Sequence, residues 1–248
     1  MAEIVTGKHG IRYRLIGTQD LISRIIRHHG EYEPELQMVS AHILQDRRGR
    51  LIDVGANMGS YCLPLAKQFP AVEIIAFEPQ QAIFTQLTAN IELNDACNVL
   101  PIHLGLSDKD EDIVTTVPDY ATEPNIGAFS LDELVRKNQY EVQTVGGNET
   151  VRLVPLDTFE FDDVLLMKID VEGMERKVLA GAVNTLRANN YPPILFEAWA
   201  WASWFEERRR ELYGFLDATG YRVIQVGNNN IAQHASRDDY RHFKFAAL

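Results

Sequence analysis

The hydrophobic pattern of this chain alternates short apolar runs with longer amphipathic segments. The apolar runs predict buried strands at residues 51–54, 73–77, 98–104, 164–169 and 193–196. Apolar residues with helical spacing follow at 81–93, 174–186 and 205–218. Strands that alternate with helices predict an α/β fold, in which helices cover both faces of a doubly wound, mostly parallel sheet.

The C-terminal pattern predicts two more strands, at 221–226 and 242–246, joined by a polar loop that begins at Gly227. We expect them to form an antiparallel hairpin at one edge of the sheet. The hairpin would complete a seven-stranded sheet within one domain that spans residues 1–248.

Two segments fall outside this alternation. The pattern of residues 1–50 predicts a short strand and two helices. We expect them to form a cap over a ligand site. Within this segment, Glu33 and Glu35 either line the site or form an exposed acidic turn. Residues 105–155 have weak periodicity, apart from a predicted hairpin of 113–117 with 150–154. A segment this long in a compact domain is usually functional, so we interpret it as a substrate-side insertion.

The run from Leu51 to Gly59 predicts a strand, a tight turn and the start of a helix. Asp53 ends the strand, and Gly55, Asn57 and Gly59 form the turn. Glycines in such a turn let a ligand approach free backbone N–H groups. Pro64 then predicts a kink or a late start of the following helix.

Glu78 ends the next predicted strand, where a carboxylate can accept hydrogen bonds from both hydroxyls of a ribose. No third glycine completes the fingerprint of a dinucleotide site, and Asp53 would repel phosphate but suits an ammonium group. These features favour S-adenosylmethionine over a dinucleotide. The alternative is a structural turn that binds no ligand.

Polar residues follow every predicted parallel strand. They are Asp53, Glu78, Ser107 with Asp108, Asp170 with Glu172, and Glu197. Because the carboxyl ends of parallel strands meet at one edge, we expect these side chains to converge there. Ser107 and Asp108 suit the edge of an adenine or form a simple turn. Asp170 suits a helix N-cap, and Glu172 a first-turn charge, if neither is functional.

Composition narrows the function further. The chain has 248 residues with 46% hydrophobic residues, which is enough for a sizeable core, and a net charge of −11 that disfavours nucleic acid as a partner. Cys62 and Cys97 have neither metal-site nor disulfide spacing. Neither a signal-peptide pattern nor an apolar run of membrane-spanning length is present, so we expect a cytoplasmic protein without membrane partners.

Several motifs resemble one known family. They are Asp53-Val54-Gly55-Ala56-Asn57-x-Gly59, Phe77-Glu78-Pro79, Leu106-Ser107-Asp108, Leu156-Asp157 and Lys168-Ile169-Asp170-Val171-Glu172-Gly173-x-Glu175. Together they look like the FkbM family of S-adenosylmethionine-dependent methyltransferases, across residues 31–221. The resemblance implies the class I methyltransferase fold, which is Rossmann-like, and methylation of hydroxyl groups on sugars, polyketides and similar small molecules.

The resemblance also implies roles for individual residues. Asp53, Gly55, Asn57 and Gly59 would hold the methionine part of the cofactor. The ribose would lie at Glu78 and Pro79, and the adenine at Ser107 and Asp108. Asp170 and Glu172 would lie near the transferred methyl group.

The sequence therefore predicts a methyltransferase (EC 2.1.1.-) that acts on a hydroxyl of a small molecule or carbohydrate. Asp170, Glu172 and Glu197 are the candidates for a general base, or for ligands of Mg²⁺ or Ca²⁺ that would orient the acceptor. N-methylation, NAD-dependent oxidation and non-catalytic nucleoside binding remain alternatives. Trp199, Trp201 and Trp204 either stack on the acceptor or pack against the sheet. A homo-oligomer is compatible with all of these functions.

Overall fold

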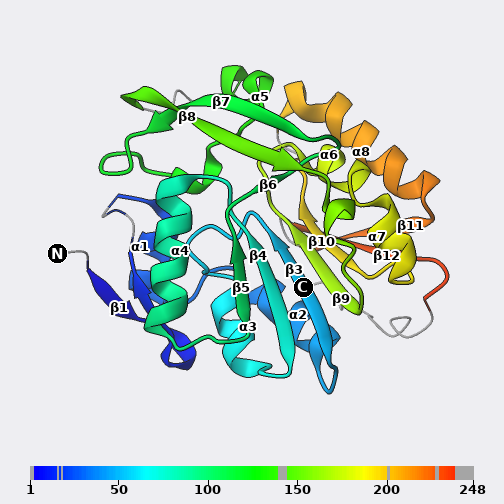
Figure 1. Cartoon of the computed structure of the whole chain (residues 1–248), viewed down its shortest axis with the longest axis horizontal. Helices are drawn as coiled ribbons and strands as arrows, with labels where there is room; N and C mark the ends of the chain where they lie inside the picture. The colour runs from blue at the N-terminus through cyan, green and yellow to red at the C-terminus, as the bar shows by residue number, and fades with distance from the viewer. Residues whose placement is uncertain are drawn as a thin grey trace.

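A computed structural model of the chain contains the expected α/β fold with a seven-stranded sheet (Figure 1). The structure describes residues 3–15, 17, 19–138, 144–199, 202–226 and 229–237. The strand order is β11-β12-β10-β9-β3-β4-β5. The bounds of these strands are β3 Gly49–Val54, β4 Val72–Phe77, β5 Val99–Ile102, β9 Val164–Ile169, β10 Ile194–Glu197, β11 Tyr221–Val226 and β12 Asn229–His234.

The C-terminal hairpin differs from the prediction in its second strand. β12 occupies Asn229–His234, which the polar pattern predicted as loop, and it pairs antiparallel with both β10 and β11. Ile231 and Ala232 are its buried apolar residues, so pairing on both sides, rather than a strong local pattern, defines this strand. The predicted strand at 242–246 lies outside the described residues.

Alternate residues of the central strands fill two separate cores, as a sheet covered on both faces requires. Leu51 packs into one core and Ile52 into the other. The first core contains residues of α1 Leu21–His29, α2 Pro34–Leu44, α3 Cys62–Gln68 and α4 Gln81–Leu93. The second contains residues of α6 Glu175–Ala180, α7 Val183–Ala188 and α8 Glu206–Ala218.

The structure gives the bounds of two helices that the sequence left uncertain or predicted wrongly. α3 starts late, so Pro64 lies in its first turn, where a missing N–H is tolerated. The single helix predicted at 174–186 is wrong, because it is divided into α6 and α7. A Cβ atom at Gly181 would lie 1.9 Å from the carbonyl oxygen of Ser107. Asp157 then accepts hydrogen bonds from the N–H groups of Asn184 and Thr185, at 3.0 and 2.7 Å, and so starts α7 anew.

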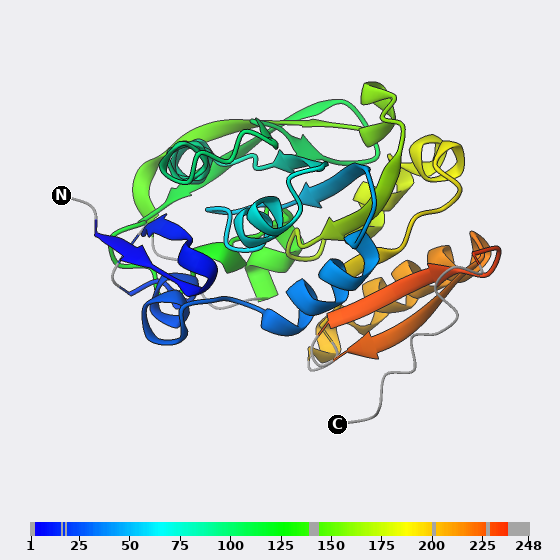
Figure 2. The ribbon, with the colours of Figure 1, turned by 90° about the horizontal axis from the view of Figure 1, so that it is seen from below.

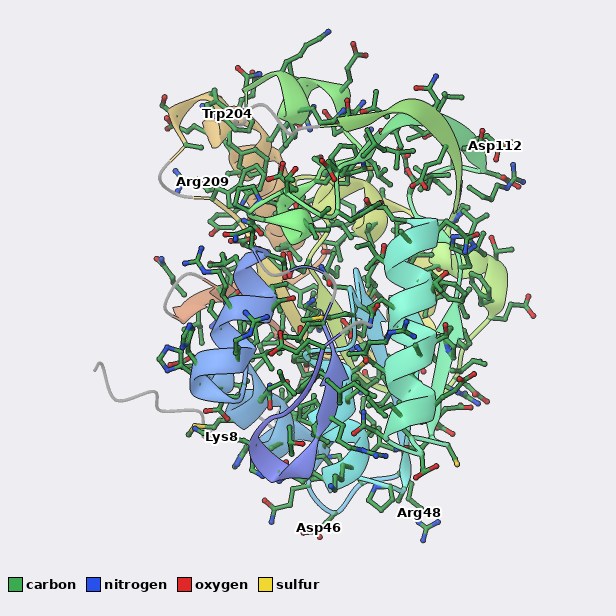
Figure 3. The ribbon with its side chains drawn as sticks, turned by 90° about the vertical axis from the view of Figure 1, so that its left-hand side faces the viewer. Lys8, Asp46, Arg48, Asp112, Trp204 and Arg209 are labelled. Carbon is green, nitrogen blue, oxygen red and sulfur yellow. The ribbon has the colours of Figure 1, made fainter. Side chains whose placement is uncertain are left out.

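The insertion forms a separate sheet over one end of the main sheet (Figure 1). It contains β6 Gly105–Leu106, β7 Glu111–Pro118 and β8 Thr144–Val154, with the short helices η2 Ile126–Ala128, α5 Glu133–Asn138 and η3 Leu156–Phe159. The predicted hairpin of 113–117 with 150–154 is confirmed, because β7 and β8 pair antiparallel. In Figure 3, Asp112 and Trp204 lie at the opposite end of the molecule from Asp46 and Arg48, which precede β3. The insertion therefore covers the carboxyl ends of the parallel strands.

The N-terminal segment lies beside the main sheet, and its Lys8 is nearer to Asp46 than to the insertion (Figure 3). It consists of β1 Ile4–Thr6, η1 Lys8–Gly10, β2 Arg12–Arg14, α1 and α2. Seen from below, β1, β2 and α1 lie at one side of the molecule and β11 with β12 at the other (Figure 2). The remaining short helix is η4 Ser203–Phe205. Within the described part of the chain, every helix is too short or too polar to cross a membrane.

Candidate active site

A cavity of about 550 Å³ opens at the carboxyl ends of β3, β4, β9 and β10. Its volume lies within the range of small-molecule sites. The sheet contributes the floor, while α1 and the segment around η2 supply further wall residues, such as Ile22 and Gly127. Polar and apolar groups both line it, so it can hold a ligand that has a flat ring and charged ends.

Two observations explain why the first residue of the loop after β3 is a glycine, Gly55. Gly55 has a left-handed backbone with φ 81°. A Cβ atom there would lie 1.9 Å from the carbonyl oxygen of Asp170. The glycine therefore allows the tips of β3 and β9 to approach each other, in addition to leaving room for a ligand. Its carbonyl oxygen accepts a hydrogen bond from Nζ of Lys168 at 3.3 Å.

Glu78 joins the tips of β3 and β4. Its carboxylate accepts hydrogen bonds from the N–H groups of Asn57 and Gln80, both at 3.0 Å. Burial raises the pKa of Glu78 to about 7, although these two N–H bonds act in the opposite direction. A carboxylate has lone pairs for about four bonds, so two hydroxyls of a ribose can still bind it.

The predicted cofactor residues divide into two groups. Gly55, Asn57, Glu78 and Pro79 line the cavity. Asp53, Gly59, Ser107 and Asp108 do not line it. Asp53, Gly59 and Ser107 are buried behind the wall, and Asp108 is exposed. The N–H of Ser107 pairs with the carbonyl oxygen of Val154, which turns this segment into the insertion sheet. Leu104, Gly105 and Leu106 form that part of the wall instead.

Lys168 is a site residue that the sequence analysis missed. It is buried in β9, with Nζ at 3.3 Å from a carboxylate oxygen of Asp170 and 3.6 Å from one of Asp53. Burial would lower the pKa of this lysine, but Asp170 and Asp53 outweigh it and raise the pKa. A lysine inside an otherwise apolar central strand was the available signal, because such a residue requires carboxylate partners.

Asp170, Glu172 and Glu197 form a carboxyl cluster, as predicted from their positions at strand ends. One oxygen from each lies within 4.8 Å of the others. Burial raises the pKa of Glu172 well above its usual value, and neighbouring Asp170 and Glu197 add to this shift. Burial likewise raises the pKa of Glu197 to about 8, with Asp170 as the next cause. Burial and mutual repulsion therefore favour the neutral forms of Glu172 and Glu197.

Glu175 explains how the turn that carries Glu172 keeps its shape. Its buried carboxylate accepts the N–H groups of Val171 at 3.3 Å and Gly173 at 3.0 Å. Glu172, between them, has a left-handed φ of 54°. Two other residues of the cavity, Glu33 and Asn57, also have positive φ, of 48° and 50°. Such conformations are costly outside glycine and are concentrated at functional sites.

Glu33 belongs to the cavity, whereas Glu35 is exposed. The amide of Asn229, at the start of β12, donates a hydrogen bond of 3.3 Å to Glu33. The sequence did not decide whether Glu33 lines the cavity or is exposed, because its partner Asn229 lies near the other end of the chain.

The aromatic residues after β10 have different environments. Trp199 lines the cavity. Its ring also packs against Trp204 and Phe205, with centroids at 5.8 and 4.9 Å, beside Val135. Trp204 thus serves packing, and Trp201 lies outside the described residues.

Comparison with solved structures identifies the fold. The crystal structure of a methyltransferase FkbM from Methylobacillus flagellatus KT superposes with a TM-score of 0.50 at 13% identity, over 75% of this chain and 44% of that one. Together with the strand order, this match identifies the fold as that of the class I methyltransferases. The family model of the methyltransferase FkbM domain matches residues 53–223. The chain belongs to the FkbM methyltransferase family.

Curated relatives agree with this assignment. A hexuronic acid methyltransferase, AglP, from Haloferax volcanii is 31% identical over 57% of this chain and 53% of its own. The 31-O-demethyl-FK506 methyltransferase FkbM from Streptomyces tacrolimicus is 30% identical, over 56% of this chain and 62% of its own. The matches thus span 53% to 62% of the lengths of these two relatives.

Proposed function

We propose that this protein transfers the methyl group of S-adenosylmethionine to a hydroxyl of a small molecule or carbohydrate. The observation that carries the proposal is that a ribose-type carboxylate, Glu78, and the carboxyl cluster of Asp170, Glu172 and Glu197 line one cavity. Family membership favours methyl transfer over the NAD-dependent alternative. The negative net charge argues against nucleic acid as the acceptor.

In this proposal the cofactor lies along the tips of β3 and β4. Gly55, Asn57 and Asp170 suit its methionine part, and Glu78 suits its ribose. Pro79 and the apolar wall at Leu104 and Leu106 suit the adenine. Asp53, Gly59, Ser107 and Asp108 would then support the cofactor from behind the wall or beside it.

The reaction is an in-line displacement at the methyl carbon. The acceptor oxygen forms a bond to the methyl group while the carbon–sulfur bond breaks, and the sulfonium becomes the neutral thioether of S-adenosylhomocysteine. The hydroxyl proton passes to a carboxylate, for which we propose Glu172 or Glu197, whose raised pKa values suit a general base. Asp170, paired with Lys168, stays available to orient the hydroxyl.

A metal-assisted form of the reaction is the second candidate. The oxygen ligands of Asp170, Glu172 and Glu197 match the preference of Mg²⁺ or Ca²⁺, and their spacing allows one ion. Such an ion would bind the acceptor hydroxyl and lower its pKa. Activity that is lost in EDTA and restored by Mg²⁺ would favour this form, whereas activity unaffected by EDTA would favour the carboxylate base.

The test of the proposal is calorimetric titration with S-adenosylmethionine, S-adenosylhomocysteine and NAD. We expect the first two ligands to bind and NAD not to bind. Glu78→Ala should abolish binding, while Glu73→Ala should leave it unchanged, because Glu73 is an exposed glutamate on β4, the strand that precedes Glu78. Binding of NAD alone would overturn the proposal. An acceptor screen would then separate O-methylation from N-methylation.

A further inference from the structure

Acidic side chains outnumber basic ones in the described wall of the cavity. Its acidic side chains are Glu33, Glu78, Asp170, Glu172 and Glu197. Among the described lining residues, Lys168 is the one cationic side chain. Its ammonium is already shared between Asp170 and Asp53, at 3.3 and 3.6 Å. A positive charge on a ligand would therefore meet carboxyl groups that have no cation of their own.

Glu33 extends this acidic wall from the N-terminal segment. It occupies the N-cap position of α2, but its side chain caps no helical N–H. It instead receives the amide of Asn229, in a left-handed conformation with φ 48° and ψ 56°. Two distant segments thus hold one carboxyl group at the cavity, where burial and then the charge of Asp170 raise the pKa of Glu33 to about 7.

The proposed cofactor and the product formed from it differ in a charge that would lie near these acidic side chains. S-adenosylmethionine carries a positive sulfonium, whereas S-adenosylhomocysteine has a neutral thioether. Both have the same adenine, ribose and amino-acid groups, so contacts with those parts largely cancel in a comparison. A cation beside a partly buried carboxyl group favours its ionised form, and the two charges then attract each other far more strongly than they would in bulk water.

We propose that Glu33, together with Glu172 and Glu197, recognises the sulfonium charge, so that the protein binds S-adenosylmethionine in preference to S-adenosylhomocysteine. This inference rests on the proposed function, since it requires the cofactor in this cavity. Its consequence is weak inhibition by the product, because loss of the charge on methyl transfer weakens binding. Glu33 is then a specificity-determining residue outside the group that handles the hydroxyl proton.

The experiment compares dissociation constants by titration calorimetry on the full chain after EDTA treatment. The ligands are S-adenosylmethionine, S-adenosylhomocysteine and sinefungin, which carries an ammonium-bearing carbon in place of the sulfonium. We expect both cationic ligands to bind at least about tenfold more tightly than S-adenosylhomocysteine. Glu33→Gln should reduce this preference about threefold or more, and Glu33→Asp, which keeps the charge, should reduce it less.

Glu35→Gln is the matched control, because Glu35 is exposed two residues away and should leave the preference unchanged. Equal binding of the charged and neutral ligands to the wild-type protein overturns the inference, whatever the variants do. A preference for the charged ligands that is unchanged in folded Glu33→Gln also overturns the inference. If none of the three ligands binds, the proposed function itself fails, which separates the two failures.

Discussion

At the scale of single residues, the raised pKa of Glu197 makes the stability of the fold depend on pH. A glutamate in an unfolded chain has a pKa near 4.3. Burial raises the pKa of Glu197 to about 8 in the folded protein. Between these values the folded protein holds a proton that the unfolded chain has lost. The free energy of unfolding therefore falls as the pH rises through this window, while ionised Glu197, one of the two proposed bases, becomes more abundant.

Glu197→Gln should remove this contribution. We expect its free energy of unfolding to fall less than that of the wild type between pH 5 and 8, by roughly 2–4 kcal/mol. Urea unfolding at a series of pH values measures the difference. If the free energies of unfolding of wild type and variant differ by a constant amount across this range, the raised pKa of Glu197 is contradicted.

Lys168 has a large expected effect on stability. Lys168→Met leaves Asp53 and Asp170 without their cation, and we expect a cost of about 3–5 kcal/mol. Lys177→Met is the control, because Lys177 is partly exposed and its pair with Asp132 is 3.6 Å long. That variant should cost less than about 1 kcal/mol. Urea unfolding near pH 7.5 compares the two, and equal costs would refute a special role for Lys168.

The sequence predicted some site residues and missed others for a physical reason. Asp170, Glu172 and Glu197 were predictable, because parallel strands bring their carboxyl ends to one edge. Lys168 and Glu33 were not assigned, since their environments depend on partners distant in the chain, namely Asp53 and Asn229.

At the scale of elements, strong local patterns were reliable. The helix 81–93 and the strand 164–169 have the bounds predicted from their apolar residues. Predictions were wrong where a contact with a distant part of the chain determines the bounds of an element. Asp157 starts α7 from outside the helix, and pairing on two sides makes a strand of the polar residues in β12. These contacts have no signal within the segment itself.

Asp20 connects two elements around the cavity. One carboxylate oxygen accepts the N–H of Ser23 at 2.8 Å and caps α1, and the other accepts the N–H of Ile126 at 3.2 Å. Asp20→Ala should cost about 1–2 kcal/mol through the lost cap. We expect it also to weaken S-adenosylmethionine binding severalfold, because Ile22 and Gly127 of the joined segments line the cavity.

Thermal unfolding and calorimetry measure these two effects of Asp20→Ala. Asp20→Asn has one acceptor oxygen and should be intermediate in both. An unchanged cofactor affinity in Asp20→Ala, at reduced stability, would limit Asp20 to capping.

At the scale of the whole molecule, the cavity joins parts that are far apart in sequence. Its wall includes residues of α1, the central strands, the insertion and the segment after β10. A ligand that contacts all of them should stabilise the folded chain as a unit. We expect S-adenosylmethionine at about 100 times its dissociation constant to add about 2.7 kcal/mol to the free energy of unfolding.

Thermal unfolding at increasing ligand concentration tests this expectation, with NAD as the control. Limited proteolysis should slow in the insertion and in the N-terminal segment together. Protection of one segment alone would contradict a shared binding site.

The hydrogen bond between Glu33 and Asn229 has a consequence for biosynthesis. The chain emerges from the ribosome N-terminus first, so Glu33 is present long before its partner exists. β12 must also enter the sheet between β10 and β11. The cavity is therefore completed late in translation, and a nascent chain stalled before residue 229 should capture no cofactor, even though its glycine loop has long been made.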